Sequence, residues 1–141
     1  MAKKISAKVI IEVLGAPKAH VEETIKLIVE KAKEYKNIKV NNDEVFDATQ
    51  IKDKPFFTTF AELNVETEDV ENLMGFCFDF MPSSVEILEP DRFDMDAVKI
   101  NNLLNDLLAR LHQYDAVLKN MNAQNIILKR EMDKLKGNKK E

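Results

Sequence analysis

The chain has 141 residues, of which 45% are hydrophobic and 33% are charged, and its net charge is −4. This length accommodates about one domain, and the composition is that of a soluble folded protein rather than a disordered one. The single cysteine, Cys77, excludes an internal disulfide and a cysteine-based zinc site. No apolar run approaches the roughly 18 residues of a membrane span. The first residues lack the apolar core of a secretory signal, so we expect a cytoplasmic protein.

Charge is distributed unevenly along the chain. Residues 1–39 carry nine basic and five acidic groups (+4), residues 40–96 carry three and fifteen (−12), and residues 97–141 carry nine and five (+4). Such blocks are most often solvated surface that keeps a protein soluble. The alternative is that the acidic surface of residues 40–96 binds a basic protein partner.

The N-terminal third has the pattern of one strand followed by one helix. Apolar residues alternate from Ile5 to Val13, which predicts a strand that ends at Gly15. Pro17 suits the first turn of a helix, which we expect to end near residues 36–37. The predicted buried stripe of this helix consists of Val21, Ile25, Ile28, Ala32 and Tyr35.

The middle of the chain predicts an antiparallel hairpin. Residues 38–50 have a weak strand signal that is interrupted at residues 41–43, where the composition indicates a turn or a bulge. Residues 57–65 alternate clearly and predict the third strand.

A second helix and a short strand complete the first 90 residues. Thr67 is a candidate helix cap, and residues 69–80 have apolar side chains at helical spacing. Residues 85–88 predict the last strand. The order β-α-β-β-α-β favours an α+β fold with a ferredoxin-like head over residues 1–90.

A ferredoxin-like sheet has both helices on one face and leaves the other face open. We expect Ile10, Leu14, Phe60 and Leu88 on that open face. Large apolar groups there would need a cover, either a partner's sheet or the C-terminal helix.

Residues 97–136 follow a seven-residue repeat, after a linker (91–96) in which Asp94 or Asp96 can cap the helix. A 3.5-residue period held over five heptads predicts a coiled coil rather than a helix that packs on a globular core. We expect a dimerisation helix followed by a flexible tail at residues 137–141. The predicted seam residues are Leu104, Leu111, Leu118, Asn125 and Met132 at one position and Ile100, Leu107, Tyr114, Met121, Leu128 and Leu135 at the other.

Asn125 is the polar residue of this seam. A buried asparagine pairs best with its symmetry mate, which favours a parallel, in-register dimer. Flanking charges agree, because Arg110 would face Asp115 of the partner subunit and Glu131 would face Lys136. Antiparallel pairing remains the alternative, as does a seam that loosens at this polar position.

Neither a catalytic site nor a cofactor or metal site is expected. The acidic residues of 89–96 lack the spacing and the glycine of a calcium loop, and helix capping explains them better. His20 and His112 have no paired ligand three or four residues away. Cys77 has the setting of a small core residue rather than a reactive thiolate, and three glycines cannot build a phosphate loop.

The sequence therefore favours a homodimeric protein-interaction scaffold or adaptor, not an enzyme, with two α/β heads joined by a parallel coiled coil. One alternative is a small-ligand-sensing regulatory domain that binds a metabolite at the dimer interface, suggested by the open apolar face. A third is weak nucleic-acid binding through the basic C-terminal end, although the acidic block would repel phosphates. That basic end consists of Lys129, Arg130, Lys134, Lys136, Lys139 and Lys140.

Overall fold

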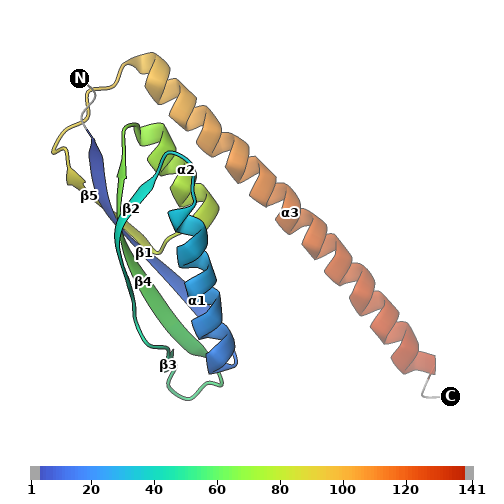
Figure 1. Cartoon of the computed structure of the whole chain (residues 1–141). Helices are drawn as coiled ribbons and strands as arrows, with labels where there is room; N and C mark the ends of the chain where they lie inside the picture. Colours follow the sequence, from blue (N-terminus) through green and yellow to red (C-terminus); the bar gives the residue numbers. More distant parts are fainter. Residues whose placement is uncertain (1–3, 139–141) are drawn as a thin grey trace. The chain divides into compact units, whose positions relative to one another are not determined.

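The computed structural model describes residues 4–138, which divide into two compact units with the boundary between residues 94 and 95. The first unit, here called the head, contains an antiparallel sheet and two helices, and the second is one long helix (Figure 1). The α+β class and the long C-terminal helix are thereby confirmed. The elements are β1 (Ile5–Gly15), α1 (Lys18–Lys33), β2 (Lys39–Val45), β3 (Thr49–Gln50), β4 (Phe57–Thr67), α2 (Val70–Phe80), β5 (Ser84–Glu89) and α3 (Ala97–Asn138).

The sheet has the strand order β2-β4-β1-β5, and the short strand β3 pairs with β4. Every pairing is antiparallel, and β1 pairs with β4 along its whole length. The predicted hairpin is confirmed, because β2 and β3 both pair with β4. The interruption at residues 41–43 is a bulge, since the register shifts between Val40 and Asn42 while β2 continues to Val45.

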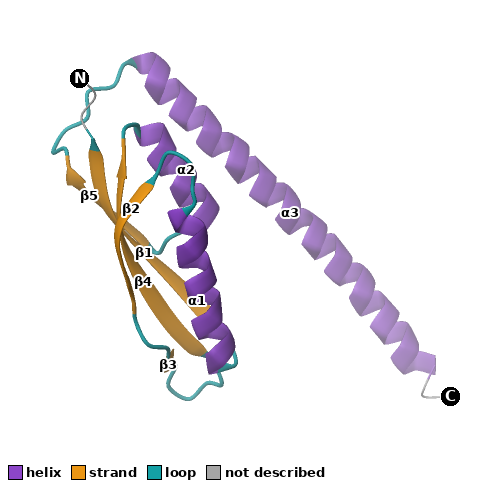
Figure 2. Ribbon diagram, in the orientation of Figure 1, coloured by secondary structure: helices purple, strands orange, loops and turns teal. Residues whose placement is uncertain are grey.

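Both helices of the head pack on one face of the sheet (Figure 2). The core joins alternate residues of β1 and β4 to α1 and α2, because successive strand residues point to opposite faces. In α1 the buried positions are Val21, Ile25, Val29 and Ala32. Ile28 of the predicted stripe is half-buried and packs against this core, and the prediction missed Val29, which lies one turn after Ile25 and is buried.

An aromatic cluster ties the turn after α1 to α2. Tyr35 contacts Phe76 and Phe80 edge-on, with ring centroids 5.4 and 5.5 Å apart. The Tyr35 hydroxyl also donates a hydrogen bond to Asp79 at 2.5 Å. Phe76 is fully buried in the core, so this contact connects the helix layer to the sheet.

The end of α1 and the cap of α2 differ from the prediction, and the cap of α3 is one of the two residues that the sequence offered. Helix α1 ends at Lys33, before residues 36–37, and Asn37 then adopts a left-handed conformation (φ 66°) that turns the chain into β2. Thr67 is the last residue of β4 and does not cap α2; Asp69 does, by accepting a hydrogen bond from the Glu71 N–H at 3.1 Å. Asp96 caps α3, accepting from a backbone N–H at 2.9 Å.

The open face of the sheet carries polar pairs between its apolar residues. Lys8 forms an ion pair with Glu62 at 3.0 Å, and Glu12 accepts a hydrogen bond from a β4 threonine. Ile10 between them is half-buried, whereas Leu14 is 62% exposed and Phe60 38% exposed. Leu88, the fourth residue predicted for this face, is 45% exposed at the register shift of β5. Charged residues separate Ile10, Leu14 and Phe60 in the register.

Helix α3 has 42 residues and continues through Gly137 to Asn138, two residues beyond the predicted end. At 1.5 Å per residue its length is about 63 Å. The remainder of the predicted tail, residues 139–141, lies outside the described residues. None of the helices in residues 4–138 is long and apolar enough to cross a membrane.

Candidate functional site

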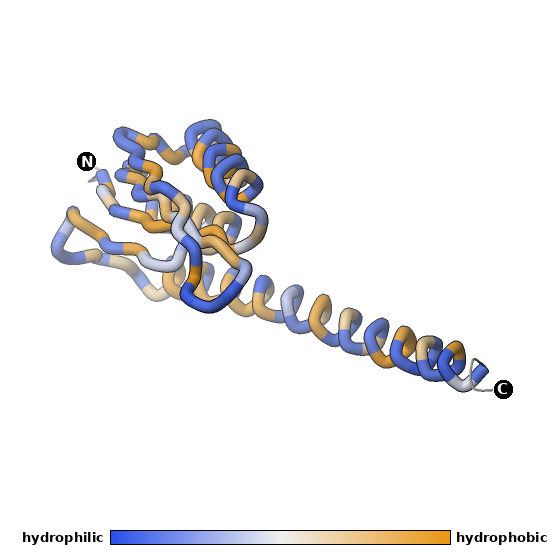
Figure 3. Tube along the Cα trace, turned by 90° about the horizontal axis from the view of Figure 1, so that it is seen from below, coloured by the Kyte–Doolittle hydropathy of each residue, from blue (hydrophilic) through white to orange (hydrophobic). Residues whose placement is uncertain are grey.

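The predicted dimerisation residues form an exposed row along α3. Ten of the eleven are exposed in the single chain, and Leu107 is half-buried. Leu111 and Leu118, in the middle of the row, are 51% and 60% exposed. Figure 3 shows hydrophobic positions recurring along the helix. Positions three and four residues apart share one helix face, so the row extends from Ile100 to Leu135, over about 53 Å.

Two polar residues of α3, Asn125 within this row and Asp115 beside it, were given roles in the predicted dimer. Asn125 is exposed, like the apolar seam residues around it. Asp115, predicted to face Arg110 of a partner subunit, forms an ion pair with Lys119 of its own helix at 2.8 Å. Exposed ion pairs contribute about 0–1 kcal/mol, so either arrangement of Asp115 is a small effect beside the apolar seam.

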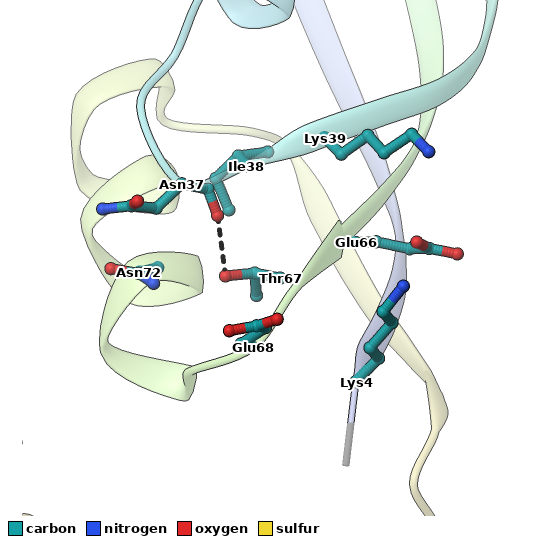
Figure 4. Close-up of a pocket in the computed structure, with 8 residues that line it drawn as sticks. All are labelled: Lys4, Asn37, Ile38, Lys39, Glu66, Thr67, Glu68 and Asn72. Atoms are coloured by element: carbon teal, nitrogen blue, oxygen red, sulfur yellow. Dashed lines mark hydrogen bonds between the residues drawn. The ribbon is translucent and has the colours of Figure 1, made fainter. Parts of the chain in front are cut away.

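The head contains a pocket of about 340 Å³ where β2 begins, β4 ends and α2 begins. Figure 4 shows the hydroxyl of Thr67 donating to the backbone carbonyl of Asn37 at 2.9 Å, which fixes the turn between α1 and β2. Lysine and glutamate side chains, two of each, give the pocket both signs of charge. Its lining residues are Lys4, Asn37, Ile38, Lys39, Glu66, Thr67, Glu68 and Asn72.

The sequence did not predict this pocket. Its residues come from the start of β1, the turn before β2, the end of β4 and the first turn of α2, and they are spread over 69 positions of the chain. No local spacing brings them together. The one local signal is Asn37, since asparagine before a strand favours the left-handed turn found there.

Comparison with known proteins places the chain in a family. The model of the MJ0538 family matches residues 6–140. The chain belongs to the MJ0538 family. The match includes both the head and α3, so the two units occur together in this family. No curated protein and no solved structure matches the chain.

Titratable groups in this MJ0538-family protein are explained by packing and surface pairing. Burial raises the pKa of the half-buried Cys77 thiol above its ordinary value, the opposite of the shift that marks a reactive thiolate. The hydrogen bond and the charge of Glu62 raise the pKa of Lys8, and Asp43 does the same for Lys33. Residues 4–138 contain no group of three or more histidine, cysteine or acidic side chains that could hold a metal ion.

Proposed function

We propose that this protein is a homodimeric scaffold or adaptor, in which a parallel coiled coil of α3 joins two ferredoxin-like heads. The observation that carries the proposal is the exposed apolar row on a helix of 42 residues. In proteins most of the stability of a helix comes from packing of its apolar face, so a second helix is the expected cover. In this arrangement the heads recognise the partner, and the acidic block of residues 40–96 favours a basic one.

The free energy gained by burying the apolar row is large enough to matter for association of two helices. Burying a leucine completely contributes about 1.5–3 kcal/mol, so a half-exposed seam residue contributes roughly 1 kcal/mol when covered. Summed over both helices, this is of the same order as the roughly 4–15 kcal/mol that association costs in lost translational and rotational freedom.

Two features support the finer parts of the proposal. The strand order β2-β4-β1-β5, with α1 and α2 sharing one core, is the order expected of a ferredoxin-like head. Asn125 favours parallel helices because it then meets its own copy and both amides can hydrogen-bond. In a fully overlapping antiparallel pair Asn125 would lie near Leu111, and a buried amide without a partner costs about 1–3 kcal/mol.

Light scattering tests the dimer directly. The wild-type chain should have a mass of about 32 kDa at micromolar concentration, twice the 16.2 kDa of one chain. Replacing both Leu111 and Leu118 by Asp should reduce the mass to that of one chain, because two charges would be buried in each helix. The matched control replaces Ile126 and Ile127 by Asp, which adds the same charge to the same helix outside the seam and should leave the dimer intact. A monomeric wild type, or equal dissociation of the control, would refute the proposal.

A second candidate is a regulatory domain that senses a small ligand. The observation in its favour is the head pocket, whose volume of about 340 Å³ and mixed charges suit a small polar metabolite. A metabolite panel should then raise the melting temperature in a concentration-dependent way, and Glu66→Gln should weaken the response. The sequence placed the ligand at the dimer interface, whereas the pocket lies within one head. The interface location stays a prediction, and loss of the thermal shift on dissociation by Leu111→Asp/Leu118→Asp would support it.

Weak nucleic-acid binding is the third candidate. Lys129, Arg130, Lys134 and Lys136 are at the end of α3, and two further lysines, Lys139 and Lys140, lie outside the described residues. Parallel pairing would double this positive charge at one end of the coiled coil. Removing residues 129–141 should abolish salt-dependent binding of a DNA or RNA duplex, and unchanged affinity would exclude this candidate.

A further inference from the structure

The two edges of the sheet differ in how well they are protected against pairing. Strand β2 at one edge carries Lys39, Asp43 and Glu44, contains a bulge and is tied to α1 by a 3.3 Å ion pair between Asp43 and Lys33. Charges and bulges are features that prevent an edge strand from pairing with another chain. Strand β5 at the other edge has the sequence Ser-Val-Glu-Ile-Leu-Glu, and its register against β1 shifts at Leu88. Residues 84–87 precede that shift, pair with β1 in one continuous register and carry a single charge, so this part of the edge is less protected than β2.

Two apolar side chains of β5 on the core face of the sheet are not covered by the helices. Val85 lies opposite Val9 and Ile87 opposite Ala7 in the β1–β5 register. Residues directly opposite one another share a face of the sheet, so Val85 and Ile87 point to the helix-covered side. Val9 and Ala7 are fully buried there, yet Val85 is 42% and Ile87 40% exposed. Within the described head, the layer of α1 and α2 therefore stops short of β5.

We propose that β5 pairs antiparallel with β5 of a second copy, so that the sheets of the two heads become continuous across the dimer. This inference rests on the proposed coiled-coil dimer, to which it adds a second contact. In the described residues β5 has β1 as its one strand partner, so its outer N–H and C=O groups are available for such a ladder.

The sequence of β5 is self-complementary in the register centred on Glu86. There Val85 of each copy lies opposite Ile87 of the other, and the four apolar side chains extend the core across the junction. Glu86 faces its own copy on the open side of the sheet. Lys8 lies directly opposite Glu86 on β1 in each head, so two lysines flank the two glutamates and reduce their repulsion.

The coiled coil would bring the two β5 strands together. Seven residues, 90–96, connect the end of β5 to the start of α3, and an extended chain of this length spans at most about 25 Å. Parallel α3 helices begin side by side, at an interaxial distance of about 8–10 Å. Each β5 is thus confined near the other at an effective concentration in the millimolar range, where a ladder of a few residues can form.

Disulfide cross-linking at the self-paired position tests this contact. In a Cys77→Ser background, Glu86→Cys would place two thiols opposite one another across the two-fold axis. The expected Cα–Cα distance of about 4.5–5.5 Å is within the range that disulfides bridge. The matched control is Glu44→Cys, the same substitution on the exposed strand β2 at the other edge. With an added mild oxidant, we expect Glu86→Cys to form linked dimers at least tenfold faster than Glu44→Cys.

A third variant tests whether pairing of β5 depends on the coiled coil. Adding Leu111→Asp and Leu118→Asp to Glu86→Cys should slow cross-linking at least tenfold, because the tether is lost. Backbone amides of residues 84–88 should likewise exchange with deuterium at least tenfold faster in Leu111→Asp/Leu118→Asp than in the wild type.

The outcomes distinguish the two contacts. A wild-type dimer by light scattering with equal cross-linking of Glu86→Cys and Glu44→Cys would overturn β5 pairing and leave the coiled coil standing. A wild-type monomer would overturn both. Rapid cross-linking of Glu86→Cys that persists in the Leu111→Asp/Leu118→Asp background would support β5 pairing and overturn the coiled coil as the contact on which it depends.

Discussion

Helices α1 and α3 are both amphipathic, but their apolar faces have different surroundings. The four buried residues of α1 are at most 3% exposed, because the sheet of the same chain covers them. The central leucines of α3 are more than half exposed in the single chain. In α1 the buried positions advance by four, four and three residues, the period of a helix on a sheet, whereas α3 keeps a strict seven-residue repeat. The period of the pattern thus distinguishes a helix whose apolar face is covered by the same chain from one whose apolar face is exposed in the single chain.

Removing the central ring of the head should have the largest effect. Phe76 is fully buried and contacts Tyr35 and Phe80. Phe76→Ala should reduce the free energy of unfolding by about 3–5 kcal/mol, measured by urea denaturation, because it leaves a cavity between α2 and the sheet. Light scattering should still detect a dimer if α3 is stabilised separately.

The control for that substitution is Phe56→Ala, at a loop position that is 44% exposed. It should change stability by less than about 0.5 kcal/mol. If Phe76→Ala dissociated the dimer at concentrations where the head remains folded, the head and α3 would not be independent, and the contrast between α1 and α3 would fail.

Replacing Asn125, the polar seam residue, should strengthen association of the chains, and this effect should be smaller than the loss of stability in Phe76→Ala. In the proposed dimer Asn125→Leu replaces a hydrogen-bonded amide pair by two apolar side chains, which is expected to strengthen association by roughly 1 kcal/mol per helix, the contribution of a covered seam leucine. The same change removes the group that specifies register, so sedimentation should detect a mixture of dimers and larger oligomers. Gln124→Leu, one residue away and outside the seam, is the control. A homogeneous dimer of unchanged affinity would place Asn125 outside the interface.

Strand and helix periodicity predicted most of the head because each element buries one face. Apolar residues alternate with other residues from Ile5 to Val13 and again over residues 57–65, because both segments bury one face in the same core. The structure confirms both strands. Thr67 was misassigned because its hydroxyl bonds to the Asn37 carbonyl, a partner 30 residues away that local pattern cannot indicate. The head pocket was missed for the same reason, since tertiary pairing of β2 with β4 assembles it.

The cap of α2 should contribute a smaller, local amount. Asp69 accepts the Glu71 N–H at 3.1 Å and places its charge at the positive end of the helix. Asp69→Ala should cost about 1 kcal/mol in urea denaturation, and Asp69→Asn, which retains the oxygen acceptor, should cost less. Asp96→Ala removes the corresponding cap of α3, so its effect should depend on protein concentration, whereas that of Asp69→Ala should not. Equal concentration dependence would contradict the assignment of the two caps to separate units.

The smallest expected effect concerns the reactivity of Cys77. Burial raises the pKa of this thiol, so the thiolate, which is the reactive form, accumulates only at more alkaline pH than in an exposed cysteine. The raised pKa also makes the free energy of unfolding depend on pH. The contribution of the protonated thiol to this free energy is complete below the unfolded-state pKa and is lost as the pH rises through the higher folded-state pKa. Iodoacetamide labelling across pH 7–10 should therefore show a later rise for Cys77 than for Gln113→Cys, an exposed α3 position, in a Cys77→Ser background. Coincident pH profiles would mean that α2 opens readily, and the contrast between a closed head and an exposed helix would then be one of degree only.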